Sequence, residues 1–231
     1  MNIQDDLQEA GNKGKAKLLA RYFKTGPGEY GEGDRFLGIT VPQIRAIAKK
    51  YRDVSMTDVE KLLHNTMHEF RLAALLILCA KFEKATGEEQ KKIVAVYLRN
   101  TKYINNWDLV DLSSHELVGT FLLNKPRTIL YTLAASKNIW ERRIAVISTF
   151  AFLRHHDFSD SMALAEILLH DTEDLMQKAV GWMLREVGKR DEKILVDFLS
   201  TRYKIMPRTM LRYAIEKFDE KHRTRYLHGQ I

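Results

Sequence analysis

Five stretches of the sequence resemble one another and decide the fold: EFRLAALLI (69–77), NNWDLVDLS (105–113), ERRIAVIST (141–149), MQKAVGWML (176–184) and MLRYAIEKF (210–218). The third residues of these stretches are separated by 36, 36, 35 and 34 positions, and they are Arg71, Trp107, Arg143, Lys178 and Arg212. A second helical pattern lies between consecutive stretches, for example at 88–100 and 125–135. A period of about 35 residues built from two helices is typical of an α-solenoid of HEAT-like repeats.

The rest of the chain also favours helices. Apolar residues recur at three- and four-residue spacing in segments such as 88–100 and 191–203, and only 4 Pro and 12 Gly are present. We therefore predict an all-α solenoid of two-helix repeats with a concave surface, forming one domain over 1–231. Its N-terminal helices are expected within 1–52 and its repeats over about 55–228. Residues 5–24 are predicted to form one helix, and Thr57–Glu60 a capping box that starts another.

Composition excludes several classes of protein. The chain has 231 residues, of which 45% are hydrophobic and 29% charged, as in an ordinary globular protein. The single cysteine, Cys79, excludes a disulfide framework and a cysteine-based zinc site. The apolar run at 72–80 is too short to cross a bilayer, and the polar, acidic N-terminus is unlike a signal peptide. We expect a cytoplasmic, intracellular protein with no membrane partner.

The chain is basic, with 37 Lys and Arg against 30 Asp and Glu and a net charge of +7. Equivalent positions of successive repeats line one surface of a solenoid, so a basic stripe is expected there. The alternative is that these side chains lie along helix faces or pair with neighbouring carboxylates. The stripe would contain Arg71, Arg143, Lys178 and Arg212, and Trp107 would occupy the equivalent position of the second repeat.

Trp107 and Asp111 form the most unusual pair of residues on this surface. Asp111 lies one helical turn after Trp107, and a carboxylate gains nothing electrostatically in a polyanion-binding groove. Asp111 is therefore interpreted as an acid, a base or an electrostatic stabiliser of a developing cation. An ion pair with Arg143 or Lys178 is the alternative. Trp182 lies one turn after Lys178 and could reach the same surface, although core packing is the more common position of a tryptophan.

Other motifs do not predict a site. His64, His68 and Glu69 give H-x3-H-E, which is not the zinc motif H-E-x-x-H and has no further clear ligand. The segment TGPGEYGEGD (25–34) is glycine-rich but lacks the GKS or GKT of a P-loop, so it is predicted to be a surface loop. We expect neither a metal nor a cofactor.

Several motifs resemble those of the AlkD-type DNA alkylation repair proteins, a family of HEAT-like DNA glycosylases. The resemblance runs from about Lys15 to Glu216 and is carried by ARYFK (20–24), FLGI (36–39), NWDLVD (106–111), ASKNIWERRIAV (135–146) and QKAVGWMLRE (177–186). It implies that Asp111 is catalytic, with Trp107 and Trp182 as the aromatic walls of the cleft. It further implies that the concave surface of the solenoid is a DNA-binding groove, that Arg143 contacts DNA there and that Tyr22 is a groove tyrosine.

The resemblance implies a monofunctional DNA glycosylase acting in base excision repair. Its substrates would be cationic alkylated purines, 3-methyladenine and 7-methylguanine, in duplex DNA. Indole rings attract cations, and a carboxylate stabilises the oxocarbenium-like sugar that forms as the base leaves. We expect a monomer. The alternatives are a non-catalytic DNA-binding protein of the same family and a scaffold that binds acidic protein surfaces.

Overall fold

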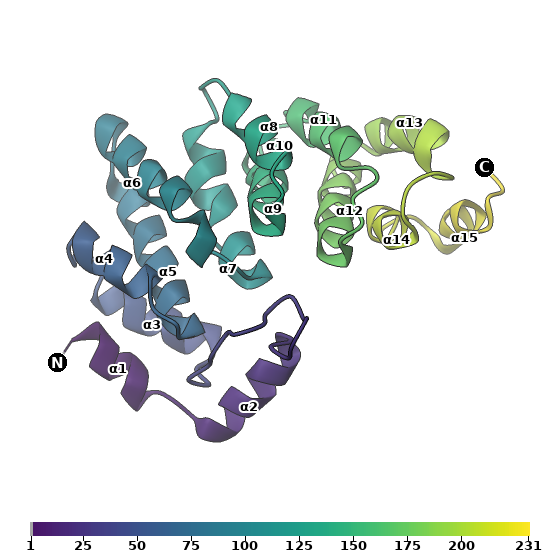
Figure 1. Cartoon of the computed structure of the whole chain (residues 1–231). Helices are drawn as coiled ribbons and strands as arrows, with labels where there is room; N and C mark the ends of the chain where they lie inside the picture. The colour runs from purple at the N-terminus through teal and green to yellow at the C-terminus, as the bar shows by residue number, and fades with distance from the viewer. Residues whose placement is uncertain (1) are drawn as a thin grey trace. The chain divides into compact units, whose positions relative to one another are not determined.

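The computed structural model describes residues 2–231, and this part of the chain is helical throughout, without a β-strand. The predicted all-α fold is confirmed. The chain divides into two compact units, residues 1–113 and 114–231, which are described separately below (Figure 1). Within the described residues, no helix combines the length and the apolar character that a membrane span requires.

The first unit is built around one buried helix, α5 (His68–Lys84). Twelve of its residues are buried, because its apolar side chains point in all directions. The helices α1, α3, α4 and α6 pack against it, and α7 touches its side. The helices of this unit are α1 (Ile3–Glu9), α2 (Lys13–Tyr22), α3 (Val41–Lys50), α4 (Met56–Leu63), α5, α6 (Gly87–Arg99), a 3-10 turn (Thr101–Tyr103) and α7 (Trp107–Asp111).

In the second unit, α12 (Asp174–Gly188) is the central helix and contacts α9, α11, α13 and α14. Gly181 allows the close approach to α14, since a Cβ there would lie 2.5 Å from the Met210 carbonyl oxygen. The remaining elements are a π-helical turn (His115–Gly119), α8 (Thr128–Ala134), α9 (Ile139–Ser148), α10 (Phe150–Leu153), α11 (Ser159–Ile167), α13 (Glu192–Arg202), α14 (Arg208–Ala214) and α15 (Glu220–His228).

Two predicted helix boundaries are wrong. The helix expected over 5–24 is divided into α1 and α2, because the side chain of Asn12 caps a new helix by accepting the Lys15 N–H at 2.9 Å. The N-cap of α4 lies two residues before Thr57, the N-cap of the predicted capping box. This N-cap is Ser55, whose hydroxyl accepts the Asp58 N–H at 3.1 Å.

Candidate functional site

Trp107 and Asp111 are the first and last residues of α7, so both lie on one face of a single helical turn. Asn106 caps this helix, and its side-chain oxygen accepts the Trp107 N–H at 2.9 Å. Both residues are half-buried.

Tyr22 and Trp107 are 85 residues apart in the chain, and the fold of the first unit brings them together. Their ring centroids are 6.1 Å apart with an angle of 70° between the planes, an edge-to-face pair. Phe23 supports the indole from within, stacked on it at 5.2 Å. Tyr22 itself is 65% exposed, an unusual position for a large aromatic side chain. The first unit thus presents two aromatic rings and a carboxylate on neighbouring elements.

The loop after α2 is anchored to the start of α5, and this fixes the position of Tyr22. The buried carboxylate of Glu69 accepts the backbone N–H groups of residues 37, 38 and 39 at 2.9, 2.8 and 3.2 Å. Gly38 has φ +88°, and a Cβ there would lie 2.1 Å from the Asn12 carbonyl oxygen. Only glycine allows the loop to lie this close to the first turn of α2.

A buried ionic cluster lies beneath Trp107. His68 is placed between two carboxylates, with Nδ1 2.9 Å from Asp34 Oδ2 and Nε2 2.8 Å from Asp108 Oδ2. Arg71 donates to the other oxygen of Asp34, and Asn106 Nδ2 donates to Asp34 at 3.2 Å. The four charged side chains are each at most 7% exposed. The cluster therefore joins α5, α7 and the loop before α3.

The charges of the cluster shift the pKa of its members. Burial alone would lower the pKa of His68, but the charge and hydrogen bond of Asp108, together with Asp34, outweigh it and raise that pKa to about 9. Burial would likewise raise the pKa of Asp34, yet the hydrogen bond from His68 and the charge of Arg71 lower it. The imidazole ring is thus positively charged at neutral pH.

The structure places Arg71 differently from the prediction of a common basic register. Arg71 is the fourth residue of α5 and donates to the carbonyls of Asn65 and Thr66 at 3.1 and 3.2 Å. The fourth residues of α9 and α12, Arg142 and Gln177, likewise donate to the carbonyls five and six residues before them. Arg71 is therefore equivalent to these two residues.

The common register is thus wrong for Arg71 and Trp107. Arg143, Lys178 and Arg212 are the fifth residues of their helices, one position or about 100° further around the helix than Arg71. Trp107 is the first residue of its helix. For Arg71 the alternative of pairing with a carboxylate holds, because its guanidinium is bonded to Asp34.

The other predicted residues lie in the second unit. Arg143 is buried on α9, and its guanidinium donates to the Leu175 carbonyl. Lys178 forms an ion pair with Asp174 at 2.7 Å, so the alternative that the basic side chains pair with neighbouring carboxylates applies to Lys178 as well. Arg212 is exposed on α14, and Trp182 is half-buried on α12. This unit therefore offers one exposed cation and one partly open indole among the predicted residues.

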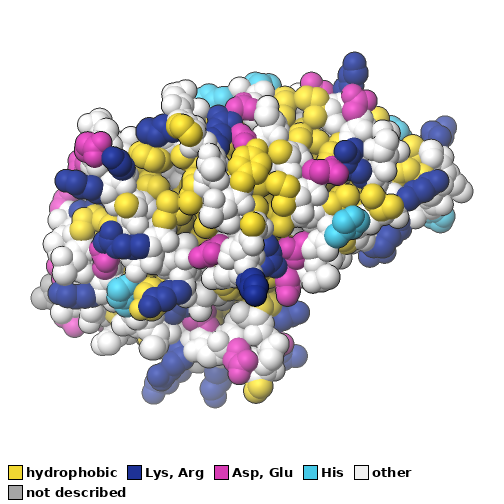
Figure 2. Space-filling model, turned by 45° about the horizontal axis from the view of Figure 1, so that its top comes forward, with side chains coloured by type: hydrophobic (Ala, Val, Ile, Leu, Met, Phe, Trp, Pro, Cys, Tyr) yellow, Lys and Arg dark blue, Asp and Glu magenta, His cyan; other side chains and the backbone are white. Residues whose placement is uncertain are grey.

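Phe150 was not predicted; it lies beside Trp182 and is itself contacted by Arg154 and Arg190. The Phe150 ring lies 6.2 Å from the indole, and the guanidinium carbons of Arg154 and Arg190 lie 4.9 and 5.6 Å from the Phe150 centroid. Two cations thus lie over the Phe150 ring. On the face drawn in Figure 2, Lys and Arg side chains alternate with acidic and apolar ones and do not form one continuous patch.

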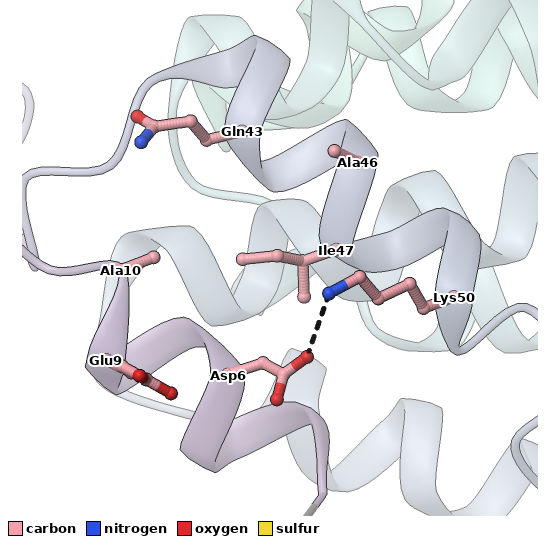
Figure 3. A pocket seen from close by; sticks show the side chains of 7 residues that line it. All are labelled: Asp6, Glu9, Ala10, Gln43, Ala46, Ile47 and Lys50. Atoms are coloured by element: carbon pink, nitrogen blue, oxygen red, sulfur yellow. Dashed lines mark ion pairs between the residues drawn. The ribbon is translucent and has the colours of Figure 1, made fainter.

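Among the described residues, no group of three or more His, Cys, Asp and Glu side chains could hold a metal ion. An open hollow of about 340 Å³ lies between α1 and α3, where Asp6 and Lys50 are 3.5 Å apart (Figure 3). None of the predicted site residues lines it.

Comparisons with known proteins agree with the fold and indicate a family. The model of the family described as DNA alkylation repair enzyme matches residues 3–218. A solved structure described as a predicted DNA alkylation repair enzyme from Enterococcus faecalis matches with a TM-score of 0.72 and 18% identity. The match covers 91% of this chain and 97% of that one, and at this identity it shows the fold alone. The search of curated proteins finds no match.

Proposed function

The chain belongs to the DNA alkylation repair enzyme family, and on this premise we propose that it is a monofunctional DNA glycosylase. Its substrates are cationic alkylated purines, 3-methyladenine and 7-methylguanine, in duplex DNA, and its products are the free base and an abasic site. The protein acts inside the cell in base excision repair, as a monomer and without a metal or cofactor.

The observation that carries the proposal is the pairing of Tyr22 and Trp107 at 6.1 Å, with Asp111 one turn along α7. An alkylated purine carries a full positive charge, and an aromatic face attracts such a cation by about 0.5 to 2 kcal/mol. A normal purine is neutral and gains none of this. Two rings beside one carboxylate therefore support selection of a cationic base.

The chemistry needs only the carboxylate and water. As the C1′–N bond breaks, its electron pair stays with the purine and neutralises it, while the sugar becomes oxocarbenium-like. The negative charge of Asp111 stabilises that cation. Water then bonds to C1′ and gives its proton to Asp111, which releases it to solvent. Trp182 is proposed as the second aromatic wall of the cleft.

DNA binding is proposed to use Tyr22, Arg143, Lys178 and Arg212. Arg212 is exposed, and Lys178 forms an ion pair with Asp174, a largely exposed carboxylate that phosphate could replace. Arg71 is assigned a supporting role, because its guanidinium is already bonded to Asp34 and two carbonyls. Binding carried by such cations must weaken steeply as salt rises.

The test is release of methylated purine from alkylated duplex DNA under single-turnover conditions. The wild type should release 7-methylguanine or 3-methyladenine. Asp111→Asn should release it about 100-fold more slowly with duplex affinity retained, because it loses charge and little volume. Asp197→Asn is the matched control, since Asp197 is an exposed carboxylate on α13, and it should match the wild type. Duplex binding without any release by the wild type would leave the non-catalytic alternative.

A further inference from the structure

His68 takes no part in the proposed chemistry, yet it connects the elements that carry the aromatic pair. Its Nδ1 and Nε2 face Asp34 Oδ2 and Asp108 Oδ2 at 2.9 and 2.8 Å. Carboxylate oxygens only accept hydrogen bonds, so both ring nitrogens must donate. A neutral imidazole has one N–H and can satisfy only one of the two carboxylates. With both carboxylates ionised, the geometry thus requires an imidazolium.

Two independent contacts lead from this ring to Trp107. In the first contact, His68 is hydrogen-bonded to Asp108, which directly follows Trp107 in the first turn of α7. The second runs through rings: Phe23 lies 5.1 Å from the imidazole and 5.2 Å from the indole. Phe36 adds a stacked contact with the imidazole at 4.6 Å. Loss of the hydrogen bond to Asp108 would therefore loosen the first turn of α7, next to the indole.

We propose that His68 is a positioning residue, whose imidazolium fixes Trp107 against Tyr22 and orients Asp111 through α7. The proposal rests on the proposed function for its catalytic consequence, although its structural part stands without it. Its consequence is that the site keeps its arrangement at neutral pH and loses it when His68 gives up its proton. Excision should then fall on the alkaline side with the titration of a residue that touches no substrate.

Few charged groups other than the two carboxylates face this ring. On α5 itself, Arg71 is bonded to Asp34, and Glu69 is bonded to the loop N–H groups. From α1, Asp6 pairs with Lys50, and from α6, Tyr97 is bonded to the Ser113 hydroxyl. The buried residues of α3 and α4 are apolar. Asp34 and Asp108 thus determine the charge state of His68.

The first experiment follows three signals of the whole protein across neutral and alkaline pH. Nuclear magnetic resonance reports the ring nitrogens of His68 and the indole N–H of Trp107, and single-turnover release of 7-methylguanine reports excision. The three midpoints should coincide near pH 9. An indole resonance that does not move while the His68 ring titrates would overturn the proposal.

Variants separate positioning from a general loss of fold. Asp108→Asn keeps an acceptor for Nε2 but removes one charge, so all three midpoints should fall by about one pH unit or more. His68→Gln should slow excision on the order of 10-fold to 100-fold with unchanged duplex affinity, and its alkaline decline should disappear. His170→Gln, at an exposed histidine in the second unit, is the control and should behave as the wild type. Unshifted midpoints in Asp108→Asn would overturn the proposal.

Failure of the proposed function can be recognised separately. If the wild type releases no methylated base, the glycosylase assignment fails. The coupling between His68 and the indole of Trp107 is still decided by the two resonance titrations, which need no substrate. If excision occurs but its pH profile is the same in the wild type and Asp108→Asn, the glycosylase assignment stands and the role of His68 is refuted.

Discussion

Protonated His68 should make the stability of the protein depend on pH in a defined window. The pKa of the ring is about 9 in the folded chain and 6.5 when unfolded, because the opposite charges of Asp108 and Asp34 outweigh the effect of burial. Such a rise corresponds to about 3 kcal/mol of unfolding free energy. The ring is almost fully buried, so solvent screening does not reduce this contribution much.

The sign follows from proton binding. Between pH 6.5 and about 9 the folded chain holds a proton on His68 that the unfolded chain has released. The contribution is therefore complete below pH 6.5, decreases as pH rises, and is absent above about pH 9. The variant His68→Gln has no proton to lose, and at pH 6 it should already be less stable than the wild type by about 3 kcal/mol, since it leaves the buried carboxylate of Asp108 without its cation.

Urea unfolding followed by circular dichroism at a series of pH values measures this difference. Other groups that titrate in this range contribute equally to both proteins, so the gap between wild type and His68→Gln isolates the histidine. The gap should be widest near pH 6 and should narrow by about 3 kcal/mol above pH 9. Parallel curves over this whole range would show that the ring is neutral in the folded chain, and would refute the reasoning.

Three further predictions concern neighbouring features. The free energy of unfolding should also fall in acid, as Asp34 takes up a proton. Because the pKa of Asp34 is lowered in the folded chain, this loss begins below pH 3.8. Thermal melting from neutral to acid pH measures it. Glu69→Gln replaces a carboxylate that accepts three N–H groups and should cost about 2 kcal/mol, with faster hydrogen exchange at residues 37–39. Gly181→Ala should cost about 1 to 3 kcal/mol in urea unfolding because α14 must move, whereas Gly14→Ala, with only ordinary contacts, should not destabilise.

The architecture could be predicted because its causes are local and repeated. A period of about 35 residues is visible in the sequence, and the apolar run in 68–84 explains why α5 is central. The cap at Asn106 was also predictable, since asparagine prefers that position. The break between α1 and α2 was missed because the periodic pattern continues across Gly11 and Asn12 while the side chain of Asn12 starts a new helix.

The register of the basic residues was predicted less well, and the reason is geometric. Aligning the repeats by residue type placed Arg71 with Arg143, although position within the helix places it with Arg142. A shift of one residue turns a side chain by about 100°, which decides whether it lies over the preceding loop or elsewhere. Residue type alone does not resolve a shift of one position when two arginines are adjacent.

The ionic cluster under Trp107 could not be predicted, because Asp34, His68 and Asp108 come from three distant parts of the chain. The one local signal was a group of polar residues, His68, Glu69 and Arg71, at the start of an otherwise apolar helix. Apolar side chains of similar volume usually stabilise a fold as well as buried ion pairs do. We infer that the cluster acts by selecting one orientation of α7. A Trp107 resonance that becomes heterogeneous when His68 loses its proton is the expected sign of that selection.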